Sequence, residues 1–317
     1  MTFNIVKFGF LWFFLLAIGT GVTHAQAMAD RKIGVMILAH GGKANWNEEV
    51  MKVRAEVDKV YPAEVALGMA SRRTIQAAAD KLAARGAERI IAVPLFISSH
   101  STVITSTEYL LGQRPDAPAD LAKFAKMDHG SGGSDGGHGS HGGGHSSHSN
   151  YDGTKPIETK LPVFMTRALD DHPKVAEILT SRAKALGSTP ENEVVIVVAH
   201  GPVTDESNRK WLADMSSLVA TMKKETDFKR IEYMTVRDDA PEPIRSQATA
   251  ELRSIVEKAK AENAEVLIVP LLLSFGGIEE GVKKRLEGLS YKMSPQGLLP
   301  DERLAQWILL SASSAGR

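Results

Sequence analysis

Short apolar runs alternate with longer amphipathic segments along most of the chain. The first half predicts strands at 32–38, 64–69, 89–93 and 162–165, and helices at 46–60, 74–85, 103–111 and 173–186. The second half predicts strands at 193–198, 230–235 and 266–269, and helices at 208–224, 244–263, 278–287 and 301–311. This alternation is typical of α/β domains, in which a small parallel sheet has helices on both faces.

Two stretches of the sequence recur in the same order. "RIIAVPLFISS" at 89–99 resembles "EVLIVPLLLSF" at 265–275, and each follows an Ala-His-Gly sequence that ends an apolar run, at 39–41 and at 199–201. A repeat of this length indicates a duplicated unit. We therefore predict two tandem α/β domains, at 30–188 and at 190–317.

A Gly-, Ser- and His-rich stretch interrupts the first predicted domain at about 128–155. Its composition cannot bury enough apolar surface to fold, so we predict a disordered insertion. Five histidines in it either gather metal for delivery to a site or bind metal adventitiously; they are His129, His138, His141, His145 and His148.

The N-terminus has the pattern of an export signal. Lys7 precedes an apolar run at 8–18, and small residues follow it. We predict a cleaved signal peptide at 1–25 and a periplasmic or secreted protein with no membrane span in the mature chain. An uncleaved membrane anchor is the alternative.

The composition limits the possible partners and metal ligands. The chain has 38 basic and 38 acidic residues, and no basic stretch interleaved with aromatic residues, which argues against nucleic acid as a partner. It has no cysteine, so any metal ligands must be His, Asp or Glu.

The candidate site lies where the predicted strands end, because ligands of parallel α/β sheets bind beyond the carboxyl ends of the strands. His40 follows the first strand, and His100 lies six residues after Pro94, beyond the third. We predict both, with Glu108, as ligands of a divalent ion such as cobalt, iron, nickel or zinc. His200 lacks such a partner, because Gly276 stands where the first half has His100.

Other interpretations of the His-Gly corner, the Ala-His-Gly sequence at 39–41 and 199–201, fit less well. No Gly-Lys-Ser/Thr or Gly-x-Gly-x-x-Gly pattern is present, which disfavours phosphate or nucleotide binding at a helix N-terminus. In histidine phosphatases an arginine precedes the histidine and clamps the phosphate, but Ala39 and Ala199 occupy that position here. A hydrogen-bonded structural histidine is the remaining alternative.

Four segments together resemble the sirohydrochlorin chelatase family of class II tetrapyrrole chelatases, in its long two-domain cobalt and iron form. They are "GVMILAHGGKANWNEEV", "RGAERIIAVPLFISSHSTVI", "VVIVVAHG" and "VLIVPLLLSFGG". The resemblance covers nearly all of the chain after residue 25. It implies two tandem chelatase-like domains that insert divalent cobalt or iron into sirohydrochlorin or a related tetrapyrrole without ATP.

The resemblance also implies that His40 and His100 are the catalytic residues, which bind the metal while one of them helps to remove the pyrrole protons. His40 matches the first metal-binding histidine of the family, and His100 stands for the second, two residues earlier than in the common pattern, where Thr102 is found. A polycarboxylate ring needs cationic partners near the strand ends; the candidates are Lys43, Arg72, Arg73, Arg167, His200 and Arg237. A periplasmic carrier of metal or haem on the same fold is the alternative function.

Overall fold

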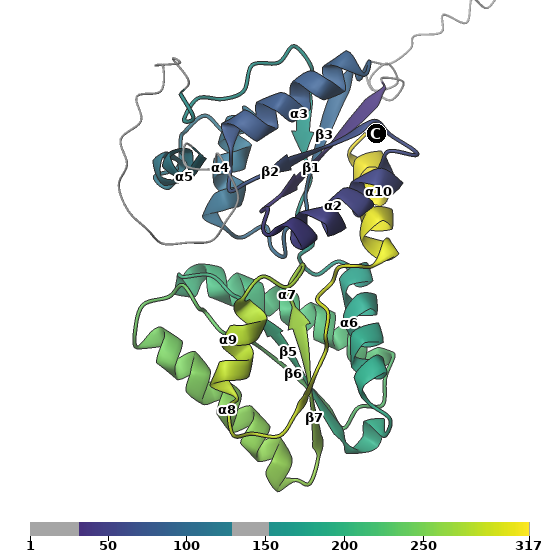
Figure 1. The fold of residues 1–317 in the computed structure, drawn as a ribbon, viewed down its shortest axis with the longest axis vertical. Coiled ribbons are helices and arrows are strands. Elements are labelled where there is room, and N and C mark those ends of the chain that lie inside the picture. The colour runs from purple at the N-terminus through teal and green to yellow at the C-terminus, as the bar shows by residue number, and fades with distance from the viewer. Residues whose placement is uncertain (1–31, 129–151, 317) are drawn as a thin grey trace, which may run out of the picture.

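The computed structural model describes residues 32–128 and 152–316, which form two lobes, one above the other in Figure 1. Each lobe contains a four-stranded parallel sheet, with strand order β2-β1-β3-β4 in the first lobe and β6-β5-β7-β8 in the second. The predicted α/β fold with two parallel sheets is confirmed. The predicted signal peptide and the five histidines of the insertion lie outside the described residues.

The first sheet and the helices that follow its strands come from residues 33–165. Its strands are β1 (Ile33–Ala39), β2 (Ala63–Leu67), β3 (Arg89–Pro94) and β4 (Val163–Met165). Its helices are α2 (Ala44–Val57), α3 (Arg72–Ala84), α4 (Thr102–Leu110) and α5 (Leu121–Asp128). Helix α5 was not expected from the sequence.

The second sheet repeats this arrangement. Its strands are β5 (Glu193–Ala199), β6 (Arg230–Thr235), β7 (Glu265–Leu271) and β8 (Lys292–Met293). The remaining helices are α6 (Pro173–Leu186), the 3-10 turn η1 (Pro190–Asn192), α7 (Asp205–Lys224), α8 (Ile244–Ala261), α9 (Ile278–Arg285) and α10 (Glu302–Ala315). The two-residue β8 also escaped sequence prediction, because so short a strand has no periodicity to detect.

Two helices exchange lobes. Helix α6 follows the first sheet but packs against α7 and β7, whereas the final helix α10 packs against α2 and β3 of the first lobe (Figure 1). The predicted domain limits of 30–188 and 190–317 place each helix with the wrong sheet. The physical reason is that each helix buries an apolar face, such as Ile178 and Leu179 on α6, and nothing in its sequence specifies which sheet receives it.

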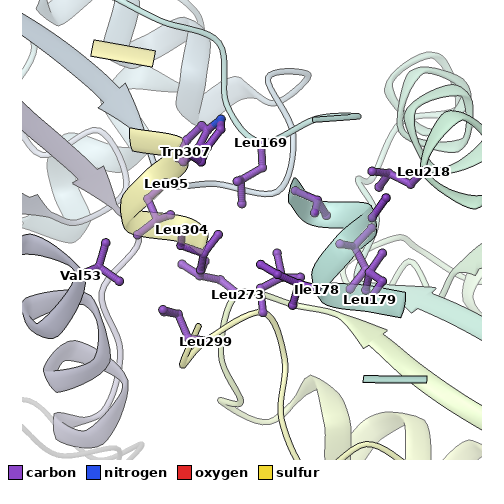
Figure 2. Close-up of a cluster of buried hydrophobic side chains, with 14 of the residues drawn as sticks. Val53, Leu95, Leu169, Ile178, Leu179, Leu218, Leu273, Leu299, Leu304 and Trp307 are labelled. Carbon is purple, nitrogen blue, oxygen red and sulfur yellow. The ribbon is translucent and has the colours of Figure 1, made fainter. Parts of the chain in front are cut away.

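The exchange joins the lobes through a common core. A single cluster of buried apolar side chains includes Val53 and Leu95 of the first lobe, Ile178 and Leu218 on the helices of the second, and Trp307 on α10 (Figure 2). The guanidinium of Arg182 on α6 donates to the carbonyl oxygens of Gly297 and Pro300, in the segment that leads to α10. The two crossing segments therefore lie side by side and brace each other.

The repeated His-Gly corner has a conformational explanation. Gly41 and Gly201 have φ values of +80° and +77°, in the left-handed region that side chains disfavour. A Cβ atom at Gly201 would also collide with the side chain of Thr235. The glycine therefore allows the chain to turn away from the sheet after each histidine and to enter the next helix.

Substituting Trp307 tests the exchange of helices. Trp307 is 2% exposed, so Trp307→Ala should lower the free energy of unfolding by about 3–5 kcal/mol, measured by urea denaturation. Leu310→Ala on the same helix is the matched control, because Leu310 is 50% exposed and its truncation should have little effect. Equal effects of the two substitutions would contradict the packing of α10 on the first lobe.

Candidate functional site

The site begins at the carboxyl ends of two neighbouring strands. His40 directly follows β1 and is exposed to solvent. Strands β1 and β3 pair in parallel, with Leu38 opposite Pro94, so the chain leaves both strands at the same edge of the sheet. The Nδ1 atom of His40 lies 2.7 Å from the carbonyl oxygen of Gly41, which requires a proton on Nδ1. The neutral imidazole then keeps its lone pair on Nε2.

The loop that holds His100 is fixed by Asp170, which follows β4. Asp170 is buried, and its carboxylate accepts hydrogen bonds from the backbone N–H of Ser99 at 2.6 Å and from the Ser99 hydroxyl at 2.7 Å. Backbone hydrogen bonds from Leu169 to Phe96 and from Asp170 to Ile97 join the same two loops. His100 is therefore held at a defined position beside Asp170.

The strand ends of the two lobes face each other across this loop. The indole N–H of Trp211 on α7 donates to the carbonyl oxygen of His100 at 3.4 Å. On another side of the interface, the hydroxyl of Ser274, beyond β7, donates to Glu49 of α2. The loops after the strands of both sheets thus meet, as the arrangement of β1 and β7 in Figure 1 also indicates.

His100 lies between carboxylates from both lobes. Its Nε2 atom is 3.9 Å from Oδ2 of Asp214, which belongs to α7. His100, Asp170 and Asp214 each offer one ligand atom, and these three atoms lie within 4.8 Å of one another. In the part of the chain that the structure describes, this is the one group of three or more His, Asp or Glu side chains close enough to share a metal ion.

Burial of Asp214 perturbs its ionisation. Removal from water and the nearby charge of Asp170 raise the pKa of Asp214 to about 6, and the nearby His100 offsets only part of this increase. Its Oδ2 atom is inaccessible to solvent and has no hydrogen-bond partner among the described residues. The site therefore holds a carboxylate that lacks compensating positive charge.

Only one of the three predicted metal ligands lies in this group. His100 belongs to the group with Asp170 and Asp214, whereas His40 and Glu108 do not. Glu108 lies on α4 and forms an ion pair with Arg114 at 3.9 Å. The role of His40 and Glu108 as ligands stays a prediction.

The predicted substrate-binding residues have varied surroundings. Lys43 is exposed at the N-terminus of α2, and Arg73 is exposed in the first turn of α3. Arg72 donates to the carbonyl oxygen of Pro156 and lies 3.6 Å from the carboxylate of Glu158. His200 lies 3.4 Å from Asp239.

The two arginines predicted alongside them have defined partners. Arg167 is mostly exposed and lies 3.1 Å from the carboxylate of Asp170, next to the group of three. Arg237 is buried and donates to Asp205 at 2.6 Å and to the carbonyl oxygen of Pro202. Arg237 therefore braces the loop after β5, whereas Arg167 remains accessible to a ligand.

Sequence reasoning missed Asp170 and Asp214. A signal for Asp214 is present, because it falls among the apolar positions of α7, between Trp211 and the buried Met215 and Leu218. An acidic residue on an apolar helix face needs a partner or a function. Asp170 offers no comparable signal, since its place beside Ser99 depends on how two loops pack.

The raised pKa of Asp214 predicts how stability changes with pH. Above pH 6 the folded protein holds an ionised Asp214, whose charge costs more free energy there than in the unfolded chain. Below the ordinary aspartate pKa the carboxyl group is protonated in both states, and this cost disappears. In metal-free protein, Asp214→Asn should therefore raise the free energy of unfolding by about 2 kcal/mol near neutral pH and by little near pH 4. Denaturant titrations at both pH values measure this, and destabilisation near neutral pH would contradict it.

Comparison with known sequences finds similarity to chelatases in the first half of the chain. Residues 34–186 match the CbiX family model. A sirohydrochlorin cobaltochelatase from Methanothermobacter thermautotrophicus is 36% identical over 70 residues, which are 21% of this chain. The aligned stretch spans about half of that relative, 49% of its length.

Comparison with solved structures shows the fold of the whole chain. SirB from Bacillus subtilis with Fe3+ has a TM-score of 0.58 at 13% identity, over 90% of this chain and 96% of that one. The sirohydrochlorin chelatase SirB from Bacillus subtilis subspecies spizizenii, in complex with cobalt, has a TM-score of 0.53 at 11% identity, over 90% and 95%. Residues 34–186 are therefore similar to the CbiX family, and the chain as a whole shares the fold of the SirB structures.

Proposed function

We propose that this protein inserts a divalent metal ion, cobalt or iron, into sirohydrochlorin or a related tetrapyrrole, without ATP. The observation that carries the proposal is the CbiX match over residues 34–186, which contains both His40 and His100 at the ends of adjacent strands. The relatives support the choice of metal, since one is a sirohydrochlorin cobaltochelatase and two structures hold Fe3+ or cobalt.

The chemistry of insertion suits these two histidines. The ring must lose two pyrrole protons as the metal enters, and a neutral imidazole can accept a proton. Imidazole nitrogen is also a good ligand for cobalt and iron. We assign His40, whose neutral tautomer keeps a lone pair on Nε2, to proton removal and metal transfer, and His100 to metal binding.

The carboxylates of the tetrapyrrole require positive charge at the edge of the site. Lys43 follows His40 by three residues, and Arg167 lies beside Asp170, so both side chains are near the strand ends and accessible. A guanidinium binds a carboxylate through two parallel hydrogen bonds, which orients as well as attracts it. We propose Arg167 and Lys43 as the first contacts of the substrate carboxylates, with Arg73 and His200 further candidates.

We propose further that the protein acts outside the cytoplasm, because Lys7 and the apolar run at 8–18 have the composition of an export signal. None of the helices within residues 32–128 and 152–316 is long and apolar enough to cross a membrane. A carrier of metal or haem is the competing function, and the histidine-rich sequence at 129–148 is the observation that favours it.

Insertion assays on single variants test the enzymatic role. His40→Ala or His100→Ala should reduce the rate of cobalt(II) or iron(II) insertion into sirohydrochlorin by at least about a hundredfold, because each removes a base or a ligand. The absorption change of the tetrapyrrole measures the rate. His172→Asn is the control, since His172 caps α6 and asparagine can replace its acceptor. Full activity in either alanine variant would contradict the assignment.

Deleting residues 128–150 separates insertion from metal supply. The deletion should leave the maximal rate unchanged and raise the metal concentration needed to reach it, because the removed histidines act only before the metal enters the site. If the intact protein binds metal or haem stoichiometrically but does not accelerate insertion, the carrier function is correct instead.

A further inference from the structure

The carboxylates of Asp170 and Asp214 come from different lobes and lie close together. The positive charge near them does not balance their two negative charges. Asp170 follows β4 of the first sheet, and Asp214 lies on α7 against the second. Most buried carboxylates are paired or hydrogen-bonded, because an isolated buried charge is costly. Asp170 has partners in Ser99 and Arg167, but Oδ2 of Asp214 has none among the described residues.

A small enclosed space adjoins the two carboxylates. A cavity of about 10 Å³ is lined by Asp170, Asp214, Ile97, Met215, Leu218 and Leu271, among others. A space of this size holds one water molecule or one ion and nothing larger. Because Ile97, Met215, Leu218 and Leu271 are apolar, an occupant of the cavity can bond only to the two carboxylates and to Ser98 or Trp211, which complete its lining.

We propose that Asp214, Asp170 and His100 bind a first-row divalent metal ion that links the two lobes. The sequence analysis named His40, His100 and Glu108 as ligands, so Asp170 and Asp214 are additions that come from the structure. The proposal stands on side-chain geometry and charge. It shares His100 with the proposed function but does not depend on tetrapyrrole insertion.

The three side chains can converge on one ion. Bonds from zinc or similar ions to imidazole nitrogen and carboxylate oxygen are about 2.0–2.2 Å long, so the ligand atoms around a tetrahedral ion lie about 3.4 Å apart. The ligand atoms of the three side chains lie within 4.8 Å of one another. Small rotations of the partly exposed Asp214 and His100 side chains would bring them into bonding range.

The ligand set indicates the class of ion. One imidazole and two carboxylates combine a borderline ligand with two hard ones, which suits iron(II), cobalt(II), manganese(II) or zinc(II) better than calcium or copper(I). Two positive charges would also neutralise the two carboxylates, which removes the electrostatic cost of burying Asp214. Such an ion would stabilise the contact between lobes, because its ligands come from both.

A cobalt(II) titration tests the site without a tetrapyrrole. The titration uses the full chain with the five insertion histidines replaced by serine, so that the insertion does not obscure the count, and is followed by visible absorption and calorimetry above pH 7. The parent should bind one equivalent, and binding should raise its thermal midpoint. Asp214→Asn should weaken binding by at least about tenfold and abolish the rise in the midpoint.

Asp171→Asn is the matched control. Asp171 is exposed and next to Asp170, and its charge acts on Asp214 as Asp170 does, yet it is outside the group of three. The control should bind cobalt(II) as the parent does. Equal affinities of Asp214→Asn and Asp171→Asn, or no binding by the parent, would overturn the metal site. A parent that binds cobalt(II) but inserts none would overturn only the proposed function.

Discussion

The exchange of α6 and α10 is the constraint on which the rest of the structure depends. Each helix buries its apolar face on the sheet of the other lobe, so the core runs continuously from Val53 to Leu218. Two separate domains joined by a linker would be free to change their relative orientation. Here the shared core holds the strand ends of the two sheets against each other, which lets a residue of α7 complete a site built on β3 and β4.

Stability and function oppose each other at the interface of the lobes. The half-buried Asp214 has a raised pKa and a buried oxygen without a hydrogen-bond partner among the described residues, although a neutral side chain of the same size would fit there at lower cost. Such local costs are common where a protein binds a charged ligand, because the ligand supplies the missing charge. Under the proposed metal site, the interface serves as a binding site as well as a contact between lobes.

Sequence periodicity predicted most of this fold, and it did so for a physical reason. Strands such as Arg230–Thr235 and helices such as Pro173–Leu186 have the same bounds in the structure as in the prediction, because alternation, proline and glycine act locally. The exchange of α6 and α10 could not be predicted, because an apolar helix face does not encode its destination. The site residues divide in the same way between local signals and tertiary packing. His40 and His100 could be predicted because they follow predicted strands, whereas Asp170 and Asp214 come close to His100 only through tertiary packing.

The position of a bound ion would test this account most directly. Anomalous diffraction at the cobalt edge, from crystals of the protein loaded with cobalt(II), locates the metal without assumptions about activity. The account predicts an ion within about 2.0–2.2 Å of ligand atoms of His100 and Asp214, between the lobes. Cobalt bound elsewhere in the protein, with Asp214 and His100 unligated, would contradict it.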